Sequence, residues 1–282
     1  MKTNNLHTWL VQARQALINV SETHDLEAQV LAAHVLGQSR AWILAHPATQ
    51  LTYSQTGRLN VLLEQLVKGA PLPYLIGRSD FHGLSFQVSP DVLIPRPETE
   101  LMIETALSWL KNHPDRHSAV DVGTGSGCIA ITLAYKAASL KILAVDCSWQ
   151  ALEIARKNTR QYQLDSRIQF ARTDLLYGIN FQFDLICANL PYIPSQKLAA
   201  LSVAKHEPRL ALDGGSDGLR VIDRLAGDAR KWLSPGGLLL LEIESEQGKS
   251  AVNLVRQYHP AAKISVLNDL AGHTRLLSIS LE

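Results

Sequence analysis

The chain has 282 residues, of which 46% are hydrophobic and 19% are charged, and its net charge is +1. This balance is typical of an ordinary globular protein with one large domain or two modest ones. It excludes a strongly basic chain that attracts nucleic acid through its overall field, and no apolar run is long enough to span a bilayer, so neither nucleic acid nor a membrane is expected as a stable partner.

The beginning of the chain predicts a small bundle of helices. Apolar side chains recur at helical spacing over residues 9–17, 26–36 and 59–66. Gly37 is expected to end the second helix, and Thr52 with Gln55 forms a typical capping box ahead of the third. We expect this bundle, residues 1–75, to be a separate domain that recognises the substrate.

A short linker, residues 76–97, is expected after the bundle. Its segment 81–95 alternates polar and apolar residues with Gly83 at a turn, which predicts a β-hairpin. Residues 99–110 then predict a helix that leads into a second domain, residues 98–282.

In the second domain, strand and helix patterns alternate. Strands are expected over residues 119–122, 142–145, 168–171, 183–188, 238–243, 264–267 and 275–279, and helices over residues 128–138, 149–162, 219–232 and 247–258. This alternation predicts an α/β, Rossmann-like fold, in which helices cover both faces of a mostly parallel seven-stranded sheet. Ligands of such sheets bind at the carboxyl ends of the strands, near the point where the strand order reverses.

A glycine-rich loop follows the first strand of this domain and precedes a helix. Its sequence is Asp121-Val122-Gly123-Thr124-Gly125-Ser126-Gly127. Glycines there permit a tight turn and the close approach of a ligand to the backbone. The spacing is G-x-G-x-G, not the G-x-G-x-x-G of dinucleotide sites, which favours S-adenosyl-L-methionine, a cofactor that has no pyrophosphate. Asp121 and the loop residues Gly123, Thr124, Gly125, Ser126 and Gly127 are therefore predicted to bind this cofactor.

Acidic residues after the next strands extend the predicted cofactor site. Asp121 is expected to contact the methionine ammonium, directly or through water, and Asp146 to accept both ribose hydroxyls. Asp174 is placed to receive the adenine amino group, with Leu175 packed on the ring. The alternative is an ordinary glycine turn with helix-capping acids, but acids after both following strands favour the cofactor site.

A second motif, Asn189-Leu190-Pro191-Tyr192, follows the strand predicted over residues 183–188. An amide nitrogen is a poor nucleophile, so a site that methylates it must hold it in line with the donor methyl and accept its N–H groups. The Asn189 side-chain oxygen and the Leu190 carbonyl are suitable acceptors beside the cofactor. Pro191 is expected to stiffen the turn and Tyr192 to stack on the planar group. The alternative is an ordinary Asn-x-Pro turn.

These motifs resemble those of class I methyltransferases that carry N-P-P-Y, and more closely those of the protein-glutamine N5-methyltransferases that modify peptide chain release factors. The resemblance runs from about residue 71 to the C-terminus. It is carried by residues 73–77, 81–88, 92–100 and 207–212, and by Gly214, Gly215, Asp217 and Gly218. One departure is Leu190, which replaces the first proline of the motif but still offers its backbone carbonyl.

The resemblance implies methyl transfer from S-adenosyl-L-methionine to the side-chain amide of the glutamine in the Gly-Gly-Gln loop of release factors. It assigns the cofactor to residues 123–127, Asp146 and Leu175, and the substrate to residues 189–192. Arg96 and Glu98 are candidates for contacts with substrate or cofactor, and the alternative is that residues 95–97 are only a rigid connector. Residues 207–209 are expected to shape a loop over the pocket, and the alternative for Arg209 is a purely structural ion pair.

Four alternatives remain open. A glutamine of a ribosomal protein would suit the same motifs, and an exocyclic amine of a nucleic-acid base would fit the same clamp. The nucleic-acid alternative is disfavoured, because the first 75 residues carry five Lys or Arg and four acids, and so form no basic binding surface. A nicotinamide oxidoreductase does not explain the glycine spacing, and a binding module explains neither motif.

Cysteine usage bears on location and on metals. Three scattered cysteines, Cys128, Cys147 and Cys187, predict no disulfide framework and a reducing, cytoplasmic environment. No spacing of cysteine and histidine is typical of a zinc site, so no metal is expected. We expect a cytoplasmic monomer whose partner is a release factor.

Overall fold

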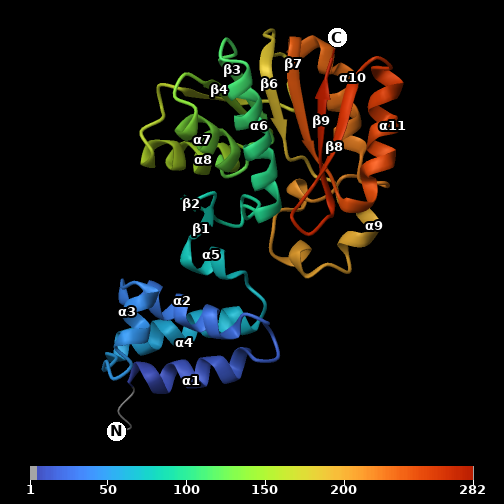
Figure 1. Ribbon diagram of the computed structural model, residues 1–282. Helices are drawn as coiled ribbons and strands as arrows, with labels where there is room; N and C mark the ends of the chain where they lie inside the picture. Colours follow the sequence, from blue (N-terminus) through green and yellow to red (C-terminus); the bar gives the residue numbers. More distant parts are fainter. Residues whose placement is uncertain (1–4, 282) are drawn as a thin grey trace. The chain divides into compact units, whose positions relative to one another are not determined.

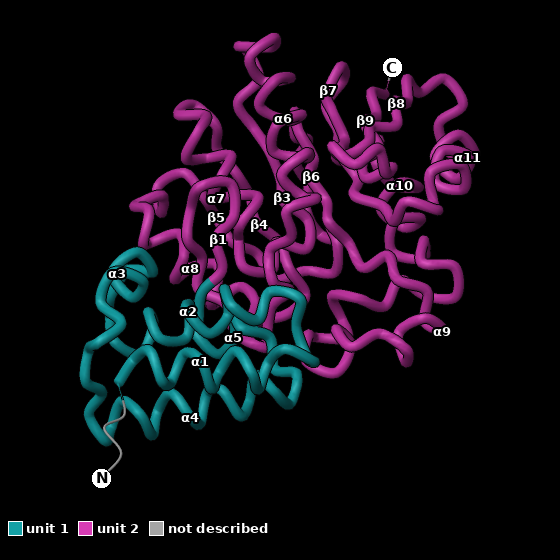
Figure 2. The backbone as a smooth tube through the Cα atoms, turned by 60° about the horizontal axis from the view of Figure 1, so that its bottom comes forward, with its two compact units in different colours: residues 1–78 teal, residues 79–282 magenta. Residues whose placement is uncertain are grey.

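The structure, a computed structural model, describes residues 5–281 and divides into two compact units. The first unit spans Met1–Arg78 and the second spans Ser79–Glu282 (Figure 2). Each unit has a hydrophobic core of its own. None of the helices within the described range is both long and apolar enough to cross a membrane.

The first unit is a helical bundle. It consists of α1 (Leu6–Leu17), α2 (His24–Leu36), α3 (Arg40–Ala45), α4 (Tyr53–Val67) and α5 (Leu72–Ile76). Trp9, Leu31 and Leu59 are buried at its centre, one from each predicted helix, so the three predicted helices are confirmed. The sequence does not predict α3 and α5, because helices of six and five residues are too short to show a period.

Both predicted helix ends are present in this bundle. The Gln55 amide donates to Thr52 Oγ1 at 3.2 Å, and the Thr52 amide donates to Gln55 Oε1 at 2.9 Å, which completes the capping box of α4. Gly37 ends α2 in the left-handed region, with φ of 65°. Glycine adopts this conformation without the strain that a side chain would add.

A short β-hairpin opens the second unit. Its strands are β1 (Arg78–Phe81) and β2 (Leu84–Gln87). The Ser85 amide donates to the Tyr162 hydroxyl at 2.7 Å, and the Gln87 amide donates to Asn158 Oδ1 at 2.7 Å, so the hairpin is fastened to helix α8 (Trp149–Gln161) and the turn after it. The expectation that the hairpin extends to Pro95 is wrong, because the residues from 88 to 96 form no strand, and their prolines lack the N–H of a ladder.

The second unit is built around a seven-stranded sheet. Its strands are β3 (Ser118–Val122), β4 (Lys141–Asp146), β5 (Ile168–Arg172), β6 (Phe183–Ala188), β7 (Leu233–Glu242), β8 (Lys263–Asn268) and β9 (Thr274–Ser280). They lie in the order β5-β4-β3-β6-β7-β9-β8, and only β9 runs antiparallel to its neighbours. The predicted Rossmann-like, mostly parallel sheet is confirmed.

Helices pack on both faces of this sheet (Figure 1). One face carries α6 (Glu100–Asn112), α7 (Cys128–Lys136) and α8, and the other carries α10 (Arg220–Trp232) and α11 (Gly248–Tyr258). Shorter elements are η1 (Pro97–Thr99), α9 (Ser195–Leu198), η2 (Ser202–Lys205), η3 (Arg209–Ala211) and η4 (Ser245–Gln247). The strands β4 and β5 lie on one side of β3, and β6 lies on the other side, so the strand order reverses between β3 and β6. A ligand crevice is expected at such a point.

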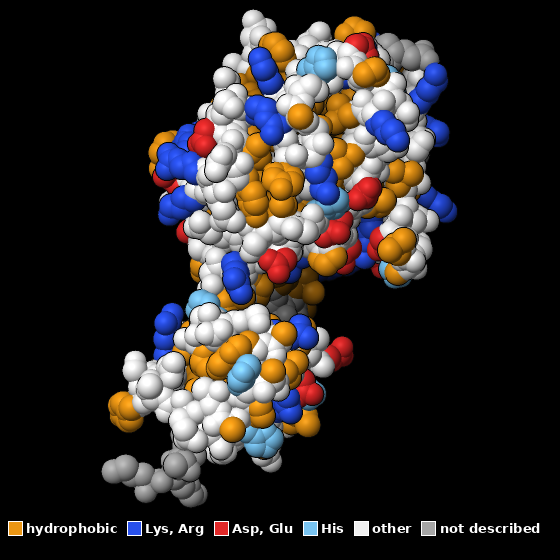
Figure 3. All heavy atoms as spheres, turned by 60° about the vertical axis from the view of Figure 1, so that its left-hand side comes forward, with side chains coloured by type: hydrophobic (Ala, Val, Ile, Leu, Met, Phe, Trp, Pro, Cys, Tyr) orange, Lys and Arg blue, Asp and Glu red, His pale blue; other side chains and the backbone are white. Residues whose placement is uncertain are grey.

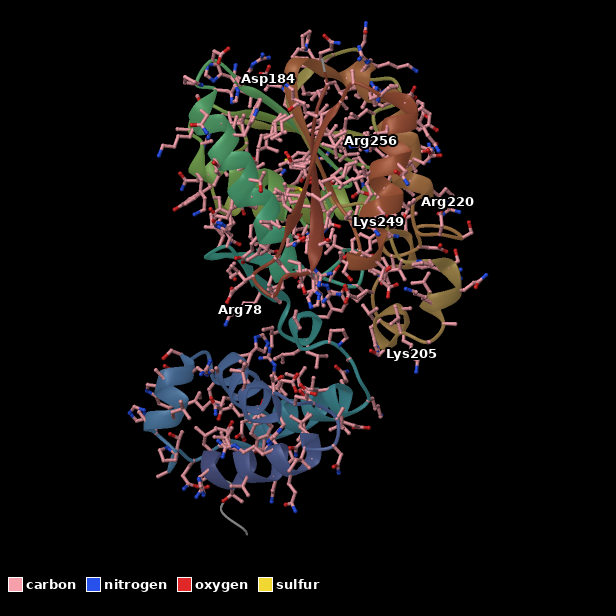
Figure 4. The ribbon with its side chains drawn as sticks, turned by 45° about the vertical axis from the view of Figure 1, so that its right-hand side comes forward. Arg78, Asp184, Lys205, Arg220, Lys249 and Arg256 are labelled. Atoms are coloured by element: carbon pink, nitrogen blue, oxygen red, sulfur yellow. The ribbon has the colours of Figure 1, made fainter. Side chains whose placement is uncertain are left out.

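The amino ends of the central strands are closed by a polar cluster. Asp184 accepts hydrogen bonds from Arg116 Nη1 at 2.9 Å and from the Ser118 hydroxyl at 2.7 Å. Burial alone would raise the pKa of Asp184, but these hydrogen bonds hold it below its usual range. Asp184 lies at one end of the sheet, and the loop that carries Lys205 lies at the other (Figure 4). The candidate site is at the latter end, among the carboxyl ends of the strands.

Candidate active site

A cavity of about 760 Å³ lies at the carboxyl ends of β3 to β6. This volume is within the range of small-molecule sites, about 300–1,000 Å³. Its wall comprises the loops that follow these strands, together with residues 91–99, the loop around residues 208–213 and the start of α10. Tertiary structure therefore brings the glycine loop and the Asn189 motif to one cavity, as predicted for neighbouring parallel strands.

The glycine loop forms the floor of the cavity. Gly123, Gly125 and Gly127 all have positive φ, of 75°, 55° and 82°. The amides of Gly123 and Thr124 both donate to the Val145 carbonyl at 2.9 Å, which holds the loop against the end of β4. Ser126 and Thr124 also line the cavity. Gly123 and Gly125 line the cavity and offer their backbone to a ligand with little side-chain bulk in the way, whereas Gly127 is buried outside the cavity wall.

Asp121 lies behind the glycine loop and does not line the cavity. It is 1% exposed, and its Oδ2 accepts hydrogen bonds from the Thr124 hydroxyl at 2.6 Å and from the Ala130 amide at 3.2 Å. Burial raises its pKa to about 7. Its Oδ1 has no partner among the described residues. Asp121 thus fastens the loop to α7, and its second carboxylate oxygen is buried behind the loop.

Asp146 ends β4 on the cavity wall. Its Oδ2 accepts a hydrogen bond from the Gly125 amide at 3.0 Å, and its Oδ1 accepts one from the Ser148 amide at 2.8 Å. Burial raises the pKa of Asp146, and the hydrogen bonds oppose that shift. Each carboxylate oxygen can accept a further hydrogen bond. This carboxylate is therefore oriented by the backbone and still able to receive two hydroxyl groups.

Asp174 and Leu175 follow β5 and also line the cavity. Asp174 is paired with Arg224 at 2.7 Å, and 61% of its side chain is exposed. Leu175 is buried and has φ of 52°, a left-handed conformation that is strained for a branched apolar residue. Such strain is found at ligand sites, where the surrounding structure enforces it.

Asn189 stands at the end of β6, on the cavity wall. Its Nδ2 donates to the Thr99 hydroxyl oxygen at 3.0 Å. The side-chain oxygen of the same amide is then the atom left for a ligand. This orientation is compatible with the predicted acceptor role of Asn189, which stays a prediction.

Leu190 and Pro191 also line the cavity, whereas Tyr192 does not. Leu190 is 4% exposed, and its Cδ2 lies 3.3 Å from the position that a Cβ of Gly123 would take. The Leu190 side chain thus packs closely over Gly123, and nothing in the structure explains why leucine replaces the proline of the motif. The Tyr192 hydroxyl donates to Glu242 Oε1 at 3.3 Å, inside the protein. Stacking of Tyr192 on a substrate stays a prediction.

Glu242, at the end of β7, is an acid that the sequence patterns do not single out. It is 2% exposed, and burial raises its pKa to about 7, although hydrogen bonding by Thr99 and Tyr192 opposes the shift. Its Oε2 has no hydrogen-bond partner within the described part of the chain. Buried carboxyl groups of this kind are costly and concentrate at functional sites.

The loop after residue 206 covers one side of the cavity. Glu207 is buried, and it accepts hydrogen bonds from the Ile94 amide at 3.0 Å and from the Arg96 guanidinium. Arg209 pairs with Asp213 at 3.2 Å, which is the structural alternative considered for this residue. Glu207 therefore ties this loop to the segment before α6, and both segments line the cavity.

The cavity wall offers hydrogen-bond acceptors and exposed backbone groups. Groups of this kind can bind a ligand and align it for reaction. No group of three His, Cys, Asp or Glu that could hold a metal ion occurs among residues 5–281. The three cysteines are all free thiols. Cys187 is buried, and Cys128 is partly buried on the cavity wall; burial raises the pKa of both thiols and leaves them poor nucleophiles.

Comparison with known proteins identifies the family of this chain. Residues 8–77 match the PrmC N-terminal domain model, and residues 99–207 match the methyltransferase small domain model. Release factor glutamine methyltransferases of Moorella thermoacetica and Coxiella burnetii are each 38% identical to the chain. The matches cover 90% and 93% of this chain, and 90% and 94% of those proteins. The chain belongs to the release factor glutamine methyltransferase family. The expected family is therefore confirmed.

Solved structures support the fold of this family member. The catalytic domain of human METTL16, crystallised with an RNA hairpin, has a TM-score of 0.58 at 19% identity, over 80% of this chain and 82% of that one. The N-terminal domain of human METTL16 in complex with SAH has a TM-score of 0.52 at 17% identity, over 89% and 94%. At such identities the likeness shows a shared methyltransferase fold and nothing about substrate.

Two residues of this methyltransferase site escape sequence reasoning. Thr99 is expected only as the first residue of a helix and as part of the segment 92–100 that carries the resemblance, and Glu242 only as part of the strand over residues 238–243. The one available signal is that Glu242 breaks the run Leu238–Leu241, because a carboxylate inside a central strand is unusual. Nothing in the sequence indicates that both would lie beside the Asn189 motif.

Proposed function

We propose that this protein transfers a methyl group from S-adenosyl-L-methionine to the side-chain amide nitrogen of the glutamine in the Gly-Gly-Gln loop of peptide chain release factors. The observation that carries the proposal is Asn189, whose amide presents its oxygen beside the cavity while its Nδ2 is engaged by Thr99. Membership of the family supplies the substrate class.

The residues around the cavity fit the cofactor. Asp146 suits the ribose hydroxyls, the glycine loop suits the amino-acid tail, and Leu175 offers an apolar surface for the adenine. The unpartnered Oδ1 of Asp121 provides negative charge behind the loop for the methionine ammonium. When bound, S-adenosyl-L-methionine supplies a methyl group on a positively charged sulfur, which is already activated for transfer. No metal is needed for this chemistry.

The residues of the Asn189 motif hold the amide nitrogen of the substrate glutamine. Asn189 Oδ1 and the Leu190 carbonyl accept its two N–H groups, which orients the nitrogen and draws electron density toward it. The nearly buried Leu190 and the loop carrying Pro191 keep water away from this position. The nitrogen loses its extra proton after transfer, so no strong base need act beforehand. Alignment is thus the main contribution of these residues.

The helical unit is proposed to bind the release factor away from the reacting loop. Hydrophobic side chains are exposed on it, including Val11, Leu44, Tyr53 and Val61. Figure 3 shows hydrophobic side chains on the surface of this unit. Because release factors act in translation, we place the protein in the cytoplasm; a monomeric state and the lack of a stable nucleic-acid partner remain predictions.

A radiolabelled methyl-transfer assay tests the proposal. Purified protein and labelled S-adenosyl-L-methionine are offered a release factor and its variant in which the Gly-Gly-Gln glutamine is alanine. Label is expected on the natural factor and not on the variant. Label on both would move the target to another residue, and label on neither would exclude this substrate and turn the search to ribosomal proteins and nucleic acid.

A further inference from the structure

The Asn189 amide is the end of a chain of side chains that begins at a buried acid. Thr99 is the N-cap residue of α6, yet its side chain makes no capping hydrogen bond. Its hydroxyl oxygen instead accepts from Asn189 Nδ2 at 3.0 Å, and hydrogen bonding by the same hydroxyl lowers the pKa of Glu242 against the effect of burial. Thr99 and Glu242 are both 2% exposed, so water does not compete for these contacts.

The order of donors along this chain follows from the chemistry of each group. Above its pKa of about 7, Glu242 is ionised and only accepts hydrogen bonds, so the Thr99 hydroxyl directs its proton toward the carboxylate. The Thr99 oxygen then has only lone pairs left for Asn189, and it requires the NH₂ side of that amide. Asparagine with the opposite orientation would place two acceptors against each other and present a donor to the cavity.

The same acid also contacts the other end of the acceptor motif. The Tyr192 hydroxyl donates to Glu242 Oε1 at 3.3 Å, and the Tyr192 carbonyl accepts from Gln247 Nε2 at 2.9 Å. Glu98 and Arg275 are the other charged groups that act on Glu242, with opposite effects. A buried carboxyl group with an unpartnered oxygen destabilises a fold, so its place behind both Asn189 and Tyr192 calls for a function.

We propose that Thr99 and Glu242 are positioning residues that fix the Asn189 amide with its oxygen toward the substrate, and thereby select a nitrogen that carries N–H. This inference rests on the proposed function. The two residues touch neither the reacting nitrogen nor the methyl group. They determine that Asn189 presents its oxygen, and not its NH₂ group, to the substrate. The site therefore prefers an amide to a group of the same shape that has no N–H.

Binding of two matched peptides tests the inference. One peptide carries N5-methylglutamine in a Gly-Gly-Gln context, and the other carries the γ-methyl ester of glutamate, which has the same shape and charge but no N–H. Affinities are measured calorimetrically with S-adenosylhomocysteine present. The wild-type protein is expected to prefer the amide by about tenfold or more, because the ester leaves the Asn189 oxygen facing another acceptor.

Variants separate positioning from a general structural role. Thr99→Val and Glu242→Gln are expected to reduce the preference to about twofold or less, whereas Thr99→Ser, which keeps the hydroxyl, should retain most of it. Thr105→Val is the matched control, since that hydroxyl bonds only to the Leu101 carbonyl of the same helix. In assays on intact release factor, Thr99→Val should lower kcat about tenfold while the KM for cofactor stays unchanged.

The outcomes distinguish this inference from the function on which it rests. An unchanged preference in both Thr99→Val and Glu242→Gln would overturn the positioning role and leave the proposed function standing. A wild-type protein that binds neither peptide, or binds both equally, would overturn the assigned acceptor site and the inference with it. Loss of preference in Glu242→Gln alone would support the inference even where Thr99→Val does not fold.

Discussion

At the scale of single residues, the site depends on polar side chains whose orientation is imposed by neighbours. Asp146 is held by two backbone amides, and Asn189 is held by Thr99. In both cases the atoms facing the cavity are acceptors. Sequence reasoning predicts these two residues because each directly follows a parallel strand, but their partners come from elsewhere in the chain.

Asn189→Ala is expected to abolish methyl transfer while cofactor still binds. The substitution removes one acceptor of the substrate N–H, and loss of a comparable hydrogen-bonding group lowers rates by about 10²–10³-fold. Transfer is measured with a release factor, and cofactor affinity by calorimetry. Full activity in this variant would refute the acceptor role of Asn189.

Asp146→Ala is expected to weaken cofactor binding about 10- to 100-fold. The variant loses two hydrogen bonds from hydroxyl groups to a charged acceptor, and the Gly125 amide loses its partner. Calorimetric titration with S-adenosyl-L-methionine checks this. Asp165→Ala is the control, because Asp165 is exposed and lies outside the cavity wall. Equal affinity in the two variants would remove the ribose role.

Asp121→Asn is expected to make the free protein more stable at pH 8 but not at pH 5. The folded-state pKa of Asp121 is raised from 3.8 to about 7, so the native state holds its proton more tightly than the unfolded chain. Stability from this group is therefore full at low pH and falls as pH rises toward 7. Between pH 5 and pH 8 the wild type should lose about 2–3 kcal/mol that the variant keeps.

Denaturant unfolding at the two pH values measures this difference. The asparagine retains an oxygen for Thr124 and Ala130, so the loop should stay in place. Parallel pH profiles for the wild type and the variant would show that Asp121 does not titrate in this range in the folded protein.

At the scale of elements, the acceptor loop owes its shape to segments far along the chain. The Ile193 amide donates to the Leu212 carbonyl, and the Gly214 amide donates to the Ile193 carbonyl. Gly218 has φ of 80°, and a Cβ there would lie 2.1 Å from the Tyr192 carbonyl oxygen. The loop after the motif therefore supports it by direct backbone contact.

Gly218→Ala is expected to lower kcat about 100-fold, because the new methyl group must displace Tyr192 and with it the acceptor motif. Gly57→Ala is the matched control. Gly57 lies inside α4 with open space around it, so alanine there should stabilise the helical unit by about 0.5–1 kcal/mol and leave transfer unchanged. Methyl-transfer rates and thermal unfolding are measured for both variants. An unchanged kcat in Gly218→Ala would contradict the supporting role of this loop.

The element predictions succeeded where a pattern is local. The seven strands of the large sheet and the long helices follow from the sequence pattern, and the capping box of α4 follows from two residue types at the right spacing. The hairpin was overestimated because the residues after Gln87 alternate in polarity without pairing. Alternation shows which side chains are buried, and residues of an irregular cavity wall can alternate as well.

At the scale of the whole molecule, the residues that line the cavity all lie in the unit that begins at Ser79, and none of them comes from the helical unit. Removal of residues 1–77 is therefore expected to raise the KM for an intact release factor far more than that for a short Gly-Gly-Gln peptide. Steady-state kinetics with both substrates measure the ratio. Equal effects on both would remove the proposed docking role of the helical unit.

The sequence by itself determined the order of elements, the class of fold, the glycine loop and the acceptor motif. These are encoded in residues close together in the chain, where steric and hydrogen-bonding preferences act directly. The tertiary structure alone decided that Thr99, 90 residues before Asn189, and Glu242, 50 residues after Tyr192, meet the motif. It also decided that Leu190 fills the space over Gly123. Contacts of this kind depend on which strands become neighbours and in which register, and burial patterns along one strand carry no information about its neighbour.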